Sequence, residues 1–120
     1  MKILIAEDDT STWRSLRRLL GVLIGQAEYD NATNGDDTLR LASNNQYDLI
    51  TMDGNLSPGR GPEIVRALRA KGCETKIIMH CGEERELKDG LKYGANAGVM
   101  KPLNLQDLIA ILKELGFVIN

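Results

Sequence analysis

The feature that most constrains the fold is a fivefold alternation between short apolar runs and longer amphipathic stretches. Residues 2–6 are apolar after the first position and stop at three acidic residues, as a strand buried on both faces does where it reaches solvent. Over residues 12–24, apolar side chains recur three and four positions apart, which predicts a helix that ends at Gly25. Because strands that alternate with helices pair in parallel, we expect an α/β fold with one doubly wound five-stranded sheet and helices on both faces.

The other strands and helices follow from the same change of period. Further strands are predicted at 27–33, 47–52, 76–80 and 97–100. Further helices are predicted at 36–43, from Pro62 to the stop at Gly72, around Leu87 and Leu91 up to Gly94, and after Asn104. We assign Leu91 and Leu105 to the buried stripes of the last two helices and residues 10–12 to the cap of the first.

Length, charge and cysteine content indicate one globular domain. We treat residues 1–120 as a single unit, since this is the length of an ordinary domain. The net charge of −2 lacks the basic excess of a nonspecific nucleic-acid binder, and no apolar run approaches the roughly 20 residues of a membrane span. Cys73 and Cys81 lack the spacing of a disulfide framework or a zinc site. We therefore expect a cytoplasmic protein with no direct nucleic-acid partner and no membrane contact.

Charged side chains follow three of the predicted strands at the point where each strand ends. Glu7 and Asp8 come after the first strand, Asp53 after the third and Lys101 after the fifth. The carboxyl ends of parallel strands meet at one edge of the sheet, where ligands of such folds bind. Neighbouring carboxylates repel one another, so they require either a raised pKa or a bound cation, and oxygen donors favour Mg²⁺. With the fixed positive charge of Lys101, this group suits phosphoryl transfer.

The same residues carry a resemblance to a known family. Through Ile3–Asp9, Asp48–Asp53, Gly94-Ala95-Asn96 and Lys101-Pro102, the chain resembles the receiver domain of bacterial two-component response regulators over essentially its whole length. The resemblance implies a flavodoxin-like (βα)5 fold with strand order 2-1-3-4-5. It implies that Asp53 is the phosphoacceptor and that Lys101, placed by a cis Pro102, pairs with the phosphoryl group. It also implies a Mg²⁺ site whose ligands are Asp53, Asp8, the backbone carbonyl of Asn55 and, through water, Glu7.

Several positions depart from the family pattern or bear on the rate at which the phosphoryl group is hydrolysed. Cys81 stands where a Ser or Thr hydroxyl normally bonds the phosphoryl oxygen, and Gly98 stands where an aromatic switch residue is usual. Ser57 replaces the usual proline in the loop after the third strand, so we expect this loop to follow another path. By the resemblance, Asn55 and Glu83 flank the water that hydrolyses the phosphoryl group. Polar or acidic residues there are typical of receivers that dephosphorylate rapidly.

We predict a free-standing receiver that is a phosphoacceptor and not an enzyme with a separate substrate. It would take its phosphoryl group from a sensor histidine kinase or a histidine phosphotransfer protein and would signal by contacting a downstream protein target. One alternative is a pseudo-receiver, a binding module that is never phosphorylated and in which Cys81 and Gly98 mark lost switching. Another is a Mg²⁺-dependent phosphatase that uses Asp53, although the DxDxT pattern of such enzymes is missing after the first strand.

Overall fold

Five strands form one parallel sheet in the described part of the chain, which is every residue except 57. They are β1 (Lys2–Ala6), β2 (Glu28–Ala32), β3 (Leu49–Asp53), β4 (Lys76–Cys81) and β5 (Ala97–Met100). In this computed structural model the strand order is β2-β1-β3-β4-β5, and every pairing is parallel. The predicted α/β fold and its strand order are therefore confirmed.

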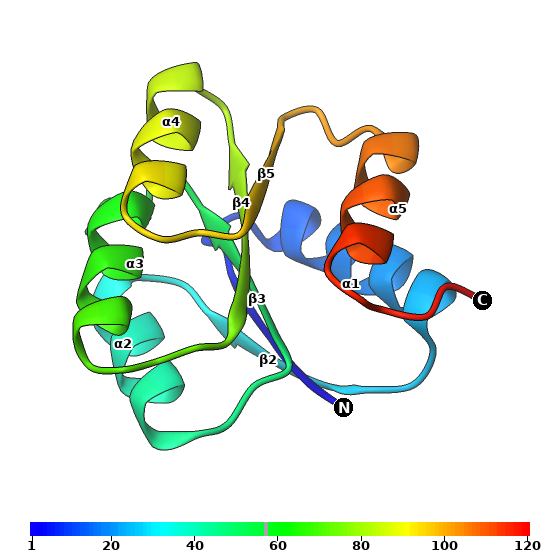
Figure 1. Ribbon diagram of the computed structural model, residues 1–120, viewed down its shortest axis with the longest axis horizontal. Helices are drawn as coiled ribbons and strands as arrows, with labels where there is room; N and C mark the ends of the chain where they lie inside the picture. The colour runs from blue at the N-terminus through cyan, green and yellow to red at the C-terminus, as the bar shows by residue number, and fades with distance from the viewer. Residues whose placement is uncertain (57) are drawn as a thin grey trace.

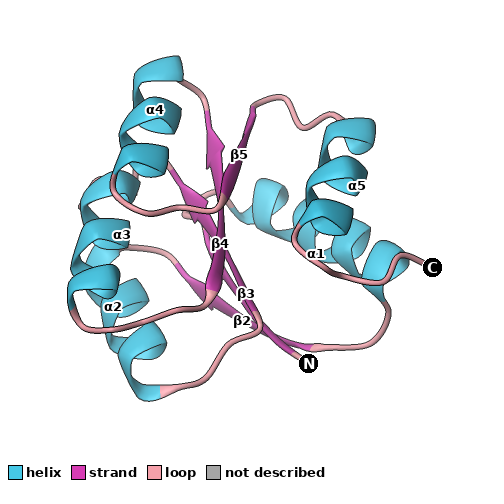
Figure 2. Cartoon of the chain, in the orientation of Figure 1, coloured by secondary structure: helices cyan, strands magenta, loops and turns pink. Residues whose placement is uncertain are grey.

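Helices cover both faces of the sheet. They are α1 (Thr10–Ile24), α2 (Gly35–Asn44), α3 (Gly61–Ala70), α4 (Glu84–Lys92) and α5 (Leu105–Glu114). α1 and α5 lie on one side, and α2, α3 and α4 lie on the other (Figures 1 and 2). Because the central strands are covered on both faces, β1 and β3 consist almost entirely of buried residues.

The pleat of β1 divides its apolar side chains between two core clusters. Ile3 and Ile5 belong to the cluster beneath α1 and α5, whereas Leu4 and Ala6 belong to the cluster beneath α2, α3 and α4. All four are at most 1% exposed. A slip of one residue would move each of these side chains to the opposite face of the sheet and so into the wrong cluster. The packing of the core therefore determines the register of the strand. In that register Ala6 lies opposite Met52, and the residues that follow each of them are brought to the same edge.

The cap of α1 is Asp9, so the prediction of residues 10–12 was wrong. The Asp9 carboxylate accepts hydrogen bonds from the Thr12 N–H at 3.0 Å and from the hydroxyls of Ser11 at 3.0 Å and Thr12 at 2.5 Å. Thr10 and Ser11 already belong to the first turn, so the cap, which supplies a partner for the free N–H groups of that turn, is the preceding residue, Asp9. Asn104 is confirmed as the cap of α5, where its side chain accepts from two backbone N–H groups.

Two predicted inward positions were also wrong. Leu91 is 45% exposed and Leu105 is 43% exposed. Leu91 lies in the last turn of α4 and Leu105 is the first residue of α5, and both helices flank β5 at the end of the strand order. A side chain at a helix end beside an edge strand has no further strand to pack on, so helical spacing alone overstates its burial.

Smaller differences concern the limits of the elements. Tyr47 precedes β3, where its hydroxyl donates a 2.6 Å hydrogen bond to Asp30, and Asp53 is the last residue of that strand rather than the first of the loop.

Among the residues described, no helix combines the length and the apolar content that a membrane crossing requires. The prediction made for Ser57 lies outside the described residues.

Candidate functional site

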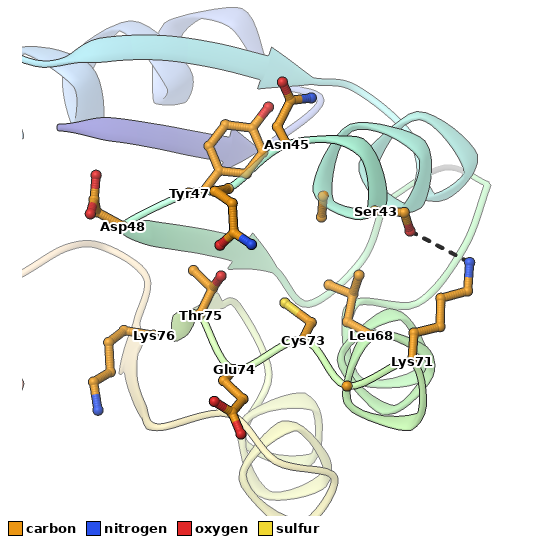
Figure 3. A pocket seen from close by; sticks show the side chains of 13 residues that line it. Ser43, Asn45, Tyr47, Asp48, Leu68, Lys71, Cys73, Glu74, Thr75 and Lys76 are labelled. Carbon is orange, nitrogen blue, oxygen red and sulfur yellow. Dashed lines mark hydrogen bonds between the residues drawn. The ribbon is translucent and has the colours of Figure 1, made fainter.

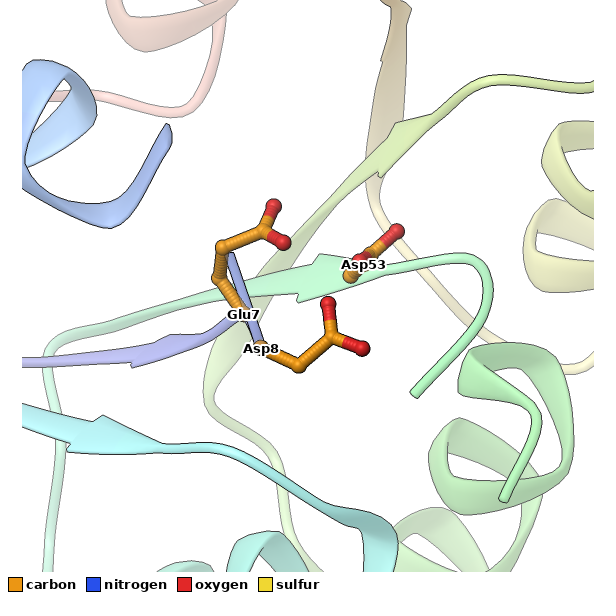
Figure 4. A group of neighbouring side chains, drawn as sticks. All are labelled: Glu7, Asp8 and Asp53. Carbon is orange, nitrogen blue, oxygen red and sulfur yellow. The ribbon is translucent and has the colours of Figure 1, made fainter. Parts of the chain in front are cut away.

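Three carboxylates meet at the carboxyl edge of the sheet, where the strand order reverses. Glu7 and Asp8 follow β1, and Asp53 ends the neighbouring strand β3. One oxygen of each lies within 4.8 Å of the others, and Figure 4 shows the three side chains grouped around one space. Glu7 and Asp53 are buried, and Asp8 is exposed. The predicted acidic group is therefore present, with oxygens close enough to share one cation.

Lys101, directly after β5, contacts two of these carboxylates. Its Nζ donates a 3.2 Å hydrogen bond to Oδ1 of Asp53 and lies 3.1 Å from Oε1 of Glu7. Its backbone N–H donates to the carbonyl of Cys81 at 2.7 Å, and its peptide bond to Pro102 is cis, as the resemblance implied. Burial lowers the pKa of Lys101, but attraction by Asp53 and Glu7 outweighs burial and holds that pKa above its ordinary value. The site thus contains a permanently charged ammonium group.

Glu7 is the most deeply buried of the three acidic residues, with 2% of its surface exposed. Its Oε2 accepts a 3.1 Å hydrogen bond from the N–H of Asp9, while its Oε1 touches Lys101 without the geometry of a hydrogen bond. Burial first, and the adjacent Asp53 next, raise the pKa of Glu7 to about 7, although the hydrogen bond from Asp9 opposes this. A cation bound beside Glu7 would favour its charged form and relieve this repulsion.

The loop after β3 folds back tightly beside Asp53. The Gly61 N–H donates to the carbonyl of Gly54 at 3.0 Å, and the Asn55 N–H donates to Oδ1 of Asp53 at 3.3 Å. A Cβ on Gly61 would overlap the backbone carbonyl oxygen of Asp53, so this position has no room for a side chain. The backbone of Asn55 is therefore held next to the carboxylates, while its side chain is exposed.

Cys81, the last residue of β4, is completely buried in the same apolar cluster as Met79. Burial first, and then the nearby Glu86 and Asp53, raise the pKa of its thiol to about 12. The thiol is therefore neutral at physiological pH. This favours a packing role over a redox-sensitive cysteine, because reactive cysteines have lowered pKa values.

His80 lies opposite Asp53 in the pairing of β4 with β3, a position that the sequence interpretation treated as an ordinary strand end. It is 5% exposed, and neither ring nitrogen has a hydrogen-bond partner in the described residues. Together with Leu16 and Leu19 of α1 it lines a hollow of about 350 Å³. Burial first, and then Lys101, lower the pKa of His80 to about 4, so the ring is neutral near pH 7.

Gly98, at the usual position of the switch aromatic, has no room for any side chain. A Cβ there would overlap Cδ1 of Leu87 from α4 and would lie 3.4 Å from Cβ of Met79. Leu87 therefore occupies the space beside β5 that a larger residue at position 98 would need.

Glu86 is a buried acidic residue that the sequence interpretation missed. It is 8% exposed and lies over Gly54, since a Cβ on Gly54 would be 2.7 Å from Cδ of Glu86. Burial first, and then Glu83 and Asp53, raise the pKa of Glu86 above its ordinary value. The available signal was Gly54 itself, because a glycine directly after the candidate phosphoacceptor leaves room for a side chain from another element. Glu83 is exposed just before α4, and its predicted place beside a hydrolytic water stays a prediction.

A separate hollow of about 730 Å³ opens at the amino edge of the sheet, away from the carboxylates (Figure 3). Tyr47 and Cys73 contribute to its lining, and Lys71 donates a 3.5 Å hydrogen bond to the hydroxyl of Ser43 beside it. Its charged residues are of both signs and do not converge on one point as those at the carboxyl edge do. We therefore assign the chemistry of the protein to the carboxyl edge.

A doubly wound parallel sheet with a charged cluster at the reversal of strand order defines an α/β domain of the flavodoxin-like class. The family model described as the response regulator receiver domain matches residues 3–113. The chain belongs to this family, as the motifs at its strand ends indicated.

Individual relatives agree with this assignment. The transcriptional regulatory protein PcoR of Escherichia coli is 34% identical over 116 residues, which are 95% of this chain and 50% of PcoR. The probable transcriptional regulatory protein SilR of Salmonella typhimurium is 33% identical over 117 residues, which are 96% of this chain and 50% of SilR. The chain thus spans about half the length of these curated relatives.

Solved structures show the same fold. A CheY-like response regulator receiver domain protein from Methanospirillum hungatei JF-1 has a TM-score of 0.81 and 29% identity, with 94% of this chain and 90% of that chain covered. The receiver domain of the sensor histidine kinase PA1611 from Pseudomonas aeruginosa PAO1, which has a magnesium ion coordinated in its active site cleft, has a TM-score of 0.82. That domain is 24% identical, with 96% of this chain and 97% of that chain covered, and is similar in fold alone.

Proposed function

We propose that this chain is a cytoplasmic phosphoacceptor of a two-component phosphorelay, in which Asp53 receives the phosphoryl group. The observation that carries the proposal is the position of Lys101, whose ammonium group contacts Asp53 and Glu7 at once. A carboxylate beside a fixed cation suits attack on phosphorus, because the cation stabilises the charge of the transferring group.

Mg²⁺ fits the donor set of the site. The clustered side chains of Glu7, Asp8 and Asp53 offer carboxylate oxygens, which this hard cation prefers. Oε1 of Glu7 is buried without a hydrogen bond, so it retains a lone pair for a metal-bound water. In this proposal Asp8, Asp53 and the backbone carbonyl of Asn55 bind the ion directly, and Glu7 binds it through water. Bound Mg²⁺ would neutralise part of the charge on the phosphoryl oxygens.

The proposed transfer forms one bond and breaks another. A carboxylate oxygen of Asp53 attacks the phosphorus of a phosphohistidine, so that an O–P bond forms while the P–N bond to the imidazole breaks. The electron pair of the broken bond stays on that nitrogen, which takes a proton from solvent. Lys101 holds the phosphoryl oxygens by charge. Attack by water on phosphorus later restores the Asp53 carboxylate and releases inorganic phosphate, so the chain turns over its own phosphoryl group only.

Asn55 and Glu83 are the residues proposed to flank the hydrolytic water. Both side chains are exposed, so solvent reaches them. We expect the phosphorylated form to decay rapidly, and a phosphorylated form that persists for many hours would contradict this part of the proposal.

The proposed partners are a sensor histidine kinase or a histidine phosphotransfer protein as donor and a downstream protein as target. The surface formed by α4, β5 and α5 exposes the large apolar residues Leu91, Met100 and Leu105. We propose that the target binds there, because exposed apolar side chains on neighbouring elements suit a protein partner. With a net charge of −2, the chain itself is not proposed to bind nucleic acid.

Labelling with a small phosphodonor tests the proposal. Incubation with acetyl phosphate and Mg²⁺, followed by intact-mass measurement, should add a single phosphoryl group to the wild type and none to Asp53→Asn. A wild type that binds Mg²⁺ weakly and gains no adduct would instead be the pseudo-receiver. Sustained turnover of a generic phosphate ester would favour the phosphatase alternative.

A further inference from the structure

Glu86 links α4 to the loop that directly follows the proposed phosphoacceptor Asp53. Its side chain lies over Gly54, close enough that a Cβ there would be 2.7 Å from Cδ and 2.8 Å from Cβ of Glu86. Gly54 in turn accepts the hydrogen bond from Gly61 that closes the loop after Asp53. The carboxylate of Glu86 is therefore packed against the backbone directly beside Asp53.

A second contact between the same two elements lies one turn further along α4. Arg60, in the loop after β3, is 3.2 Å from Asp89 of α4 and 3.5 Å from Glu63 of α3. The Asp89 contact joins this turn of α4 to the loop. Both partners of Arg60 are partly exposed, so this contact is weaker than the packing of a buried side chain.

The space that a switch aromatic would use is filled by α4 itself. Leu87, the residue after Glu86, occupies the volume beside Gly98, and a Cβ on Gly90 would be 2.6 Å from Cγ of Met79. Because no side chain at position 98 can move between two positions, a change at Asp53 needs another route to α4.

We propose that Glu86 is this route: its buried carboxylate holds the first turn of α4 over Gly54 while Asp53 is unmodified, and phosphorylation of Asp53 expels it. The inference rests on the proposed function of Asp53. A phosphoryl group replaces one negative charge by about two. Like charges repel strongly where burial removes screening water, and the neighbouring Glu83 adds a further negative charge that Arg60 offsets only in part. Expulsion of Glu86 frees the first turn of α4 and alters the surface made with β5 and α5.

Thermodynamic linkage makes the effect reciprocal. If an occupied Asp53 site disfavours the packed Glu86, then the packed Glu86 disfavours occupation of the site by the same factor. Glu86→Gln keeps the shape of the side chain and removes its charge. This variant should therefore bind beryllofluoride, a reversible mimic of the phosphoryl group, at least about 5-fold more tightly than the wild type in the presence of Mg²⁺.

Hydrogen exchange of the full chain, measured by mass spectrometry with saturating beryllofluoride and Mg²⁺, tests the proposal. In the wild type, the amides of residues 87–90, whose hydrogen bonds to residues 83–86 close the first turn of α4, should exchange several-fold faster when the site is occupied. In Glu86→Gln this acceleration should be lost. Glu84→Gln is the matched control, because Glu84 belongs to the same turn but is exposed and, among the described residues, pairs with Lys88 alone. The control should respond as the wild type does.

A second variant keeps the test independent of the folding of the first. In Gly54→Ala the new methyl group takes the space of the Glu86 side chain, so exchange in α4 should already be fast without any ligand. Equal responses of wild type and Glu86→Gln, together with slow exchange in unliganded Gly54→Ala, would overturn the role of Glu86 while leaving Asp53 phosphorylation intact. Absence of the acetyl phosphate adduct from the wild type would instead overturn the proposed function, and this inference with it.

Discussion

Leu87 fills the volume that a side chain at position 98 would require, because its Cδ1 methyl stands where a Cβ on Gly98 would be. The two residues belong to α4 and β5, so their contact determines how closely this helix approaches the edge of the sheet. An aromatic residue at position 98 is therefore incompatible with the observed position of the Leu87 side chain.

We expect Gly98→Ala to lower the free energy of unfolding by about 1–3 kcal/mol, since an added methyl in a filled space forces its neighbours apart. Urea unfolding measures this. The double variant Gly98→Ala with Leu87→Ala should be more stable than the sum of the single effects predicts, because each change makes room for the other. Additive effects would show that the two side chains do not compete for one space.

Lys101→Met should abolish labelling by acetyl phosphate and lower stability by about 1–3 kcal/mol, because it leaves Glu7 and Asp53 buried without their shared cation. Adding Asp53→Asn should restore part of the stability by removing one of the two charges. Lys88→Met is the control, since Lys88 forms an exposed pair whose loss costs less than about 1 kcal/mol.

His80 predicts a pH dependence with a defined sign. The pKa of His80 is about 4 in the folded protein, below its ordinary value of 6.5, so the folded state resists protonation. The stability that neutral His80 contributes is present above pH 6.5 and is lost as the pH falls from 6.5 to 4, by at most about 3 kcal/mol. Urea unfolding of wild type and His80→Leu at pH 7 and pH 5 measures the difference. If both proteins lose equal stability between these pH values, His80 does not titrate as described.

Mg²⁺ should stabilise the wild type against unfolding by about 2.7 kcal/mol when its concentration is 100 times the dissociation constant. Asp8→Asn should lose this increment, because it removes a proposed ligand that is exposed and lies outside the core. Calorimetric scans with Mg²⁺ and with EDTA measure the shift in melting temperature. A full Mg²⁺ shift in Asp8→Asn would remove Asp8 from the ligand set.

Gly61→Ala should lower stability by more than about 2 kcal/mol and prevent labelling of Asp53, because the new methyl overlaps the Asp53 carbonyl oxygen and the backbone has to move. Gly82→Ala is the matched control: a Cβ there meets nothing within 4 Å, and we expect a change within about 0.5 kcal/mol. Equal labelling of both variants would show that the loop tolerates a side chain at position 61.

The sequence alone was sufficient to predict the features that depend on the order of residue types along the chain. Alternation of apolar runs with helical spacing predicted the parallel sheet, and the acidic and basic residues at strand ends predicted the meeting of Glu7, Asp8, Asp53 and Lys101. These predictions succeeded because the spacing of apolar residues along the sequence indicates which side chains are buried. In addition, the carboxyl ends of parallel strands meet at one edge of the sheet whatever the details of packing. The exposed Leu91 and Leu105 mark the limit of this reasoning, since a period does not reveal where a helix runs past its sheet.

Only the tertiary structure decided which distant residues share a space. Glu86 over Gly54, Leu87 beside Gly98 and His80 opposite Asp53 all join different elements, and each contact depends on how closely two elements pack. No local sequence pattern encodes how closely two elements approach each other, because their separation results from the shapes of all the side chains between them. The charges proposed to act at Asp53 can therefore be read along the chain, whereas the proposed path from Asp53 to α4 depends on packing in three dimensions.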